Sequence, residues 1–104
     1  MKVMICCSAG MSTNLLLSKM IQSVRQRALD VEIEAIPEAE INERLKDCDV
    51  FLLGPQIRYR FNSVKMDAEP YGIPVAIIDT VKYAKMDGQA VLDQALDLYK
   101  KSKE

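Results

Sequence analysis

The chain has 104 residues, of which 49% are hydrophobic and 28% are charged, and its formal net charge is −1. We expect a single domain over residues 1–104 that buries about 65% of its unfolded surface without disulfides. A net charge near zero gives no long-range attraction to nucleic acid or anionic membranes. There is neither a secretory signal nor an apolar run of the ~18 residues needed for a membrane span. We therefore expect a cytoplasmic protein with reduced cysteines and no direct membrane insertion.

The hydrophobic pattern predicts four strands that alternate with four helices. In chain order, we expect a strand at 2–6, a helix at 12–28, a strand at 31–36, a helix at 38–46, a strand at 50–53, a helix at 57–68, a strand at 73–78 and a last helix from 87 onward. This alternation predicts an α/β fold, a four-stranded parallel sheet with helices on both faces. The pattern does not determine the order of the strands in the sheet.

Three loops are expected to meet at one edge of this sheet. Ligands of open parallel sheets bind beyond the carboxyl ends of the strands. The segments that leave those ends are residues 7–13, 54–57 and 79–87. A candidate site is therefore expected where these three loops come together.

The loop that follows the first strand has the composition of an anion site. Cys7 is followed by small and hydroxyl residues and then by a helical pattern that Ser12 or Gly10 could cap. A helix N-terminus offers N–H groups and about half a positive charge to an anion. A thiol placed there loses its proton more easily. We therefore interpret Cys7 as a nucleophile that handles phosphate.

The absent residues narrow this chemistry. The chain contains no histidine, so it can form neither a Ser–His or Cys–His pair nor a phosphohistidine. The loop has one glycine and no lysine, which excludes a Walker loop and a dinucleotide fingerprint. Low-molecular-weight tyrosine phosphatases carry a similar cysteine loop with an arginine six residues after the cysteine, where this chain has Thr13. Such a site suits a phosphoryl carrier better than a hydrolase.

Metal and cofactor sites are not expected. The three cysteines lack the paired spacings of zinc sites, and adjacent cysteines are not the Cys-x-x-Cys of thioredoxin-like centres. We interpret Cys6 as a core residue and Cys48 as a structural thiol at the opposite end of the sheet from Cys7.

Three motifs together resemble a known family. They are Cys7-Ser8-Ala9-Gly10-Met11-Ser12-Thr13, Leu53-Gly54-Pro55-Gln56-Ile57 and Ile78-Asp79 … Tyr83 … Met86-Asp87-Gly88. In order and along almost the whole chain, they resemble the IIB component of the lactose/cellobiose (N,N′-diacetylchitobiose) phosphotransferase systems. The resemblance implies a sugar phosphotransferase subunit that accepts a phosphoryl group from a phosphohistidine of IIA. It also implies that a phosphocysteine donates this group to a sugar on the membrane component IIC.

The resemblance also implies roles for single residues. Cys7 would be the phosphorylated nucleophile, with no cofactor. Gln56 would lie near Cys7 and Tyr83 would be a neighbouring supporting residue. The phosphate-cradling loop would consist of Ser8, Ala9, Gly10, Met11, Ser12 and Thr13. The isolated chain is expected to be a monomer that associates with IIC at the membrane periphery.

Other readings stay open at this stage. The same cysteine loop could belong to a small phosphatase or an arsenate-reductase-like enzyme, or to a regulatory module that binds a small anion. Asp79 is expected to hydrogen-bond its own loop, since a carboxylate would repel a thiophosphate. Arg58 and Arg60 form either a solvated face or a contact surface for a partner.

Overall fold

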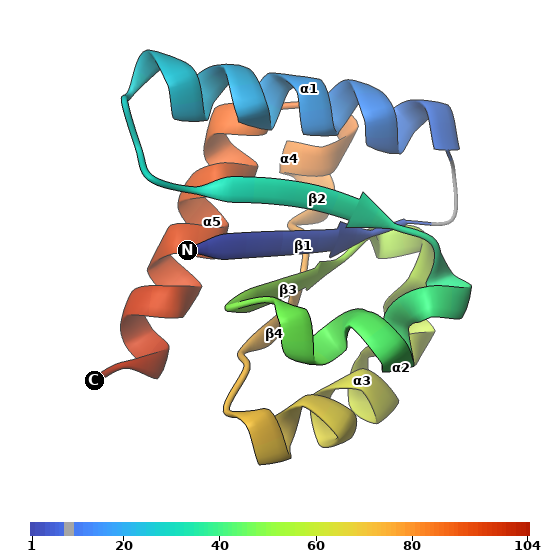
Figure 1. Cartoon of the computed structure of the whole chain (residues 1–104). Coiled ribbons are helices and arrows are strands. Elements are labelled where there is room, and N and C mark those ends of the chain that lie inside the picture. Colours follow the sequence, from blue (N-terminus) through green and yellow to red (C-terminus); the bar gives the residue numbers. More distant parts are fainter. Residues whose placement is uncertain (8–9) are drawn as a thin grey trace.

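A parallel sheet of four strands forms the centre of the computed structural model, which describes residues 1–7 and 10–104, with side chains for all of these except 10–13. The strands are β1 (Lys2–Cys6), β2 (Glu32–Ile36), β3 (Val50–Leu53) and β4 (Val75–Ile77), in the spatial order β2-β1-β3-β4. The predicted fold class is confirmed, and the structure adds the strand order (Figure 1).

Helices cover both faces of the sheet (Figure 1). In the described chain they are α1 (Gly10–Gln26), α2 (Ile41–Arg44), α3 (Phe61–Ala68), α4 (Thr80–Ala84) and α5 (Gly88–Ser102), with short 3₁₀ helices η1 (Glu38–Glu40), η2 (Leu45–Asp47), η3 (Pro55–Arg60) and η4 (Glu69–Tyr71). Successive strand side chains point to opposite faces. Val3 and Ile5 of β1 therefore join the core under α1 and α5, whereas Met4 and Cys6 join the core over α2 and α3.

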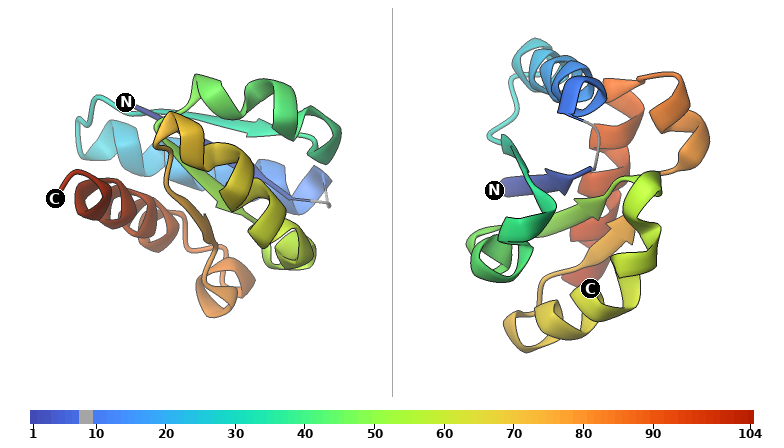
Figure 2. Two further views of the ribbon diagram at one scale, coloured as in Figure 1. Left: turned by 90° about the horizontal axis from the view of Figure 1, so that it is seen from below. Right: turned by 90° about the vertical axis from the view of Figure 1, so that its right-hand side faces the viewer.

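The strands end level with one another at their carboxyl ends. Cys6 of β1 is in register with Ile36 of β2 and with Leu53 of β3, and Leu53 is in register with Ile77 of β4. Looking at this edge, Figure 2 (right) shows the start of α1, η3 and α4 arranged around the end of β1. The predicted meeting of the segments after β1, β3 and β4 at one edge is confirmed.

The first predicted helix is shifted toward the amino terminus. It begins at Gly10 and ends at Gln26 instead of spanning 12–28, so Ser12 lies inside the helix and does not cap it. Ala28 has φ = 52°, and the N–H of Leu29 donates to the carbonyl of Val24 at 3.0 Å. The helix is thus followed by a residue with left-handed backbone torsions, a position that glycine usually occupies. Because alanine occupies the position, the residue type does not mark the end of the helix.

Several other boundaries differ from the prediction. The helix expected at 38–46 is three short pieces, η1, α2 and η2, and the helix expected at 57–68 is η3 followed by α3. Buried Ile57 has non-helical torsions (φ −116°, ψ 27°), which separate the first turn of η3 from the rest. The strands expected at 31–36 and 73–78 are trimmed to Glu32–Ile36 and Val75–Ile77. The last helix is confirmed, with Asp87 as its N-cap.

No helix in the described part of the chain is both long and apolar enough to cross a membrane.

A charge cluster joins the edge strand β2 to its neighbours. The Oε1 atom of Glu34 forms ion pairs with Arg44 Nη2 at 2.7 Å and with Lys2 Nζ at 2.6 Å. The hydrogen bond from Arg44, with that from Lys2, lowers the pKa of Glu34 from 4.5 to about 2. The ionised carboxylate therefore contributes to stability, although about a third of the side chain is exposed and solvent weakens the effect.

The Glu34→Gln variant should lose stability in a pH-dependent way. A depressed carboxyl pKa stabilises the fold above the ordinary value of 4.5, and this contribution is lost as the pH falls toward about 2. The difference in free energy of unfolding between wild type and variant should therefore shrink between about pH 5 and pH 2. Urea unfolding at several pH values measures it, and a difference that stays constant with pH would contradict this account.

Candidate functional site

Cys7 lies at the carboxyl end of the central strand, where the sulfur is nearly enclosed. It follows β1 directly, is 8% exposed and belongs to the core cluster beneath α1 and α5. α1, a helix of 17 residues, begins at Gly10, three positions after the cysteine. The predicted arrangement of a cysteine between a strand and a helix N-terminus is confirmed by these bounds.

The proposed phosphate-cradling loop falls largely outside the described structure. Ser8 and Ala9 are not among the described residues, and neither are the side chains of residues 10–13. The roles assigned to Ser8, Ala9, Gly10, Met11, Ser12 and Thr13 therefore stay predictions.

Gly54 leaves the space that the Cys7 side chain occupies. It follows β3, and its N–H donates to the carbonyl of Cys6 at 2.7 Å. A Cβ atom on Gly54 would lie 2.5 Å from Cys7 Sγ and 3.0 Å from Cys7 Cβ, closer than such atoms approach in proteins. The glycine is thus required by close approach and not by its backbone torsions, since its φ is −63°.

Gln56 also lies close to Gly54. Its Oε1 atom would be 3.0 Å from that added Cβ atom, so the amide and the Cys7 sulfur both border Gly54. Gln56 is otherwise exposed to solvent. The structure therefore places next to the same glycine as Cys7 an amide that can donate or accept hydrogen bonds, while the role that the resemblance implies for Gln56 stays a prediction.

Tyr83 reaches the same core from α4. Its side chain is 7% exposed and shares a buried cluster with Cys7 and Ile78. Asp79 is the N-cap of α4, and its Oδ1 accepts from the N–H groups of Val81 at 3.0 Å and Lys82 at 3.1 Å. The expected hydrogen bonding of Asp79 to its own loop is confirmed, and it orients the helix that carries Tyr83.

Sequence reasoning missed two side chains that hold the flanking segments in place. Gln94 of α5 donates from Nε2 to the carbonyl of Ile77 at 2.9 Å, and its Oε1 accepts from the N–H of Asp79 at 3.0 Å. It thus fills the hydrogen-bonding positions that a further strand would occupy at the end of β4. A glutamine on a helix face gives no signal for this role, because its partners lie 15 and 17 residues away.

Glu38 is the second such side chain. It follows β2, and its carboxylate accepts from Arg60 Nη1 at 2.9 Å and from the Tyr59 hydroxyl at 3.1 and 3.2 Å. Because β1 lies between β2 and β3, these contacts tie η3 to η1 across the end of the central strand. The structure therefore pairs Arg60 within the chain and leaves Arg58 exposed.

The other two cysteines are inert by their surroundings. Burial raises the pKa of Cys6 to about 12 and that of Cys48 to about 12. Cys6 points to the opposite face of the sheet from Cys7, and Cys48 Sγ donates to the carbonyl of Leu45 at 3.2 Å, before the start of β3. The interpretation of both as structural residues is confirmed.

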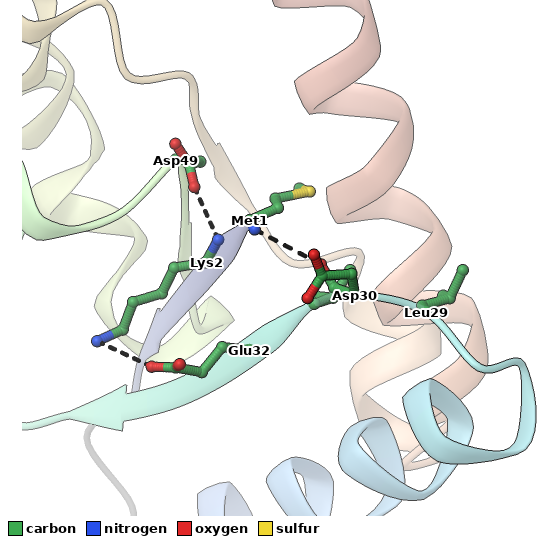
Figure 3. Close-up of a pocket in the computed structure, with 7 residues that line it drawn as sticks. Met1, Lys2, Leu29, Asp30, Glu32 and Asp49 are labelled. Carbon is green, nitrogen blue, oxygen red and sulfur yellow. Dashed lines mark hydrogen bonds and ion pairs between the residues drawn. The ribbon is translucent and has the colours of Figure 1, made fainter.

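A pocket at the opposite, amino-terminal edge of the sheet is held together by its own contacts (Figure 3). Asp49 Oδ2 accepts from the N–H of Lys2 at 2.7 Å, and Lys2 Nζ pairs with Glu32 at 3.4 Å.

Among the described residues, no group of three histidine, cysteine or acidic side chains is placed to hold a metal ion. We therefore place the candidate site at the Cys7 edge.

The Gly54→Ala variant should displace the Cys7 sulfur. The new methyl group collides with Sγ, so we expect slower alkylation of Cys7 by iodoacetamide and a loss of about 1–3 kcal/mol in the free energy of unfolding. Gly72→Ala is the matched control. It loses stability because the residue has a φ of 67°, and an added Cβ meets no atom within 4 Å, so alkylation of Cys7 should be unchanged. Equal alkylation rates for wild type and Gly54→Ala would contradict the close approach.

The Gln94→Leu variant should loosen α4 more than it destabilises the whole fold. It leaves the carbonyl of Ile77 and the N–H of Asp79 without their partner, so hydrogen exchange in residues 79–84 should speed up about tenfold or more. Gln89→Leu, on the exposed side of the same helix, is the control. Unchanged exchange at residues 79–84 in Gln94→Leu would show that this side chain does not hold the segment.

Comparisons with known proteins point to one family. A family model described as "PTS system, Lactose/Cellobiose specific IIB subunit" matches residues 2–94. The oligo-beta-mannoside-specific EIIB component of Bacillus subtilis (strain 168) is 34% identical over 93% of this chain and 94% of its own length. The cellobiose-specific EIIB component of Lactococcus lactis subsp. lactis (strain IL1403) is 38% identical over 92% of this chain and 94% of its own.

A solved structure agrees with these sequences. The solution structure of the cellobiose-specific phosphotransferase IIB component protein from Borrelia burgdorferi superimposes with a TM-score of 0.81 at 33% identity. The superposition covers 98% of this chain and 94% of that one. Sequence and fold are thus similar to the same group of proteins along the full domain.

Proposed function

Because this chain belongs to the family of lactose- and cellobiose-specific IIB subunits of the phosphotransferase system, we propose that it relays a phosphoryl group through Cys7. The donor is a phosphohistidine of the IIA component, and the acceptor is a sugar bound by the membrane component IIC. The observation that carries the proposal is the position of Cys7, nearly enclosed between the central strand and the start of a 17-residue helix.

The proposed transfer has two balanced steps. In the first, the Cys7 thiolate attacks the phosphorus in line, an S–P bond forms, and the P–N bond to the donor histidine breaks. In the second, a sugar hydroxyl oxygen attacks the phosphorus, and the S–P bond breaks. The proton of the sugar hydroxyl passes to a base outside this chain, and the Cys7 thiolate is regenerated. The helix N-terminus favours the anionic sulfur and the phosphoryl oxygens in both steps.

The lack of histidine and of the phosphate-clamping arginine supports a carrier over a hydrolase. The chain has no histidine and no arginine at position 13. Asp79 lies in the segment after β4, but its Oδ1 accepts two N–H groups of α4, and this favours a structural role. A small phosphatase or arsenate-reductase-like enzyme is the alternative, and turnover of p-nitrophenyl phosphate would favour it.

The neighbours of Cys7 suggest supporting roles. The amide of Gln56, which borders the same point as Sγ, can donate a hydrogen bond to a phosphoryl oxygen. Tyr83 packs within the buried cluster that includes Cys7 and so supports the core next to the thiol. The hydroxyl and N–H groups of residues 8–13 would complete the cradle, and no metal or organic cofactor takes part.

The proposal also covers the sugar that receives the phosphoryl group and the location of the protein in the cell. The two relatives described above are specific for oligo-β-mannoside and cellobiose. We propose a β-linked disaccharide such as cellobiose, chitobiose or lactose, selected by IIC and not by this chain. The protein would be a cytoplasmic monomer that associates peripherally with IIC, with no role in binding nucleic acid.

The decisive experiment supplies IIA, the general phosphocarriers and phosphoenolpyruvate and follows the intact mass of the chain. We expect the gain of one phosphoryl group on wild type and none on Cys7→Ser. Cys48→Ser is the matched control and should be phosphorylated like wild type, since Cys48 is buried at the other edge. No added mass on wild type, or the same added mass on Cys7→Ser, would refute the carrier. Anion binding and function retained by Cys7→Ala would favour a regulatory module.

A further inference from the structure

Exposed hydrophobic side chains occur on each of the segments that follow β1, β3 and β4 at the edge that holds Cys7. Five large ones are strongly exposed in the described part of the chain, and three belong to segments that leave the carboxyl ends of strands. These three are Leu15 of α1, Tyr59 of η3 and Val81 of α4, with exposed fractions of 50%, 70% and 60%. Apolar groups that gather around one site are typical of an interaction surface.

Tyr59 differs from the other two because its orientation is fixed. Its hydroxyl donates to the Glu38 carboxylate, at 3.1 and 3.2 Å from the two oxygens, while most of the side chain stays in solvent. An aromatic ring held in this way loses little conformational entropy when a partner covers it. Buried aromatic anchors of this kind carry much of the binding energy in protein interfaces.

The charges beside Tyr59 favour a negatively charged partner. Arg60 Nη1 contacts Glu38 at 2.9 Å, so these two charges offset one another. Arg58 is exposed and forms no ion pair with any residue that the structure describes. A single uncompensated cation next to an exposed ring is complementary to an anionic surface and speeds association with it.

We propose that Tyr59, flanked by Arg58, is the anchor on which the phosphorylated IIA component docks. This inference rests on the proposed function and names the surface that serves it. Cys7 is only 8% exposed, so a protein that brings a phosphohistidine to the sulfur must also cover the segments around it. IIA is chosen over IIC because the donor arrives with the phosphoryl charge, whereas the sugar acceptor is neutral.

The test compares two tyrosines of similar exposure. Tyr59 is 70% exposed beside the site, and Tyr71 is 60% exposed in η4, before β4 and away from it. The initial rate of Cys7 phosphorylation is measured against the concentration of phosphorylated IIA. We expect Tyr59→Ala to raise the half-saturating concentration about tenfold with an unchanged rate at saturation, and Tyr71→Ala to change it less than about twofold. Tyr59→Phe keeps the ring but loses the Glu38 contact and should fall between them.

A second measurement tests the charge. Arg58→Gln should slow phosphorylation at low IIA concentration and weaken its dependence on salt. One contrary result is that wild type is phosphorylated normally while Tyr59→Ala and Tyr71→Ala have equal half-saturating concentrations of IIA. This result would overturn the proposal that Tyr59 anchors IIA and would leave the carrier function intact. An effect of Tyr59→Ala confined to transfer from Cys7 to the sugar on IIC would likewise overturn it. Absence of any phosphorylation of wild type would refute the function itself.

Discussion

The close approach of Gly54 to Cys7 is the constraint around which the site is built. The parallel register brings the ends of β1 and β3 level. Cys7, which follows β1, therefore lies beside Gly54, which follows β3. Only a side chain of a single hydrogen at position 54 leaves room for the sulfur between these two segments. The Gln56 amide borders the same glycine, so this one position leaves room for both the Cys7 sulfur and a polar neighbour.

Two side chains remote in sequence stabilise this arrangement from either side. Glu38 holds η3 from the β2 side, and Gln94 holds the start of α4 from α5. Gln94 does so by bonding backbone groups at and just beyond the end of the last strand, and Glu38 does so by bonding the side chains of Tyr59 and Arg60. The segments that flank Cys7 are therefore fixed although they are short and irregular, which suits a site that must meet partner proteins with a constant shape.

The sequence predicted the fold and the position of Cys7 between a strand and a helix, because both depend on local patterns. The apolar runs and helical spacings define the βα alternation, and alternation of this kind implies the parallel sheet. The strand order, the split of 57–68 at Ile57 and the helix end at Ala28 were not predictable, because tertiary packing and not residue type produces them. The roles of Glu38 and Gln94 were missed for the same reason, since their partners are distant in the chain.

The adjacent cysteines show how strand geometry places two neighbouring thiols in different surroundings. Cys6 and Cys7 are chemically identical neighbours, yet one belongs to the core on one face and the other to the core on the opposite face. A slip of β1 by one residue would exchange their places. It would bring a cysteine into the site but would also turn every apolar side chain of β1 to the wrong face. The packing of the sheet therefore determines which of the two cysteines occupies the proposed site.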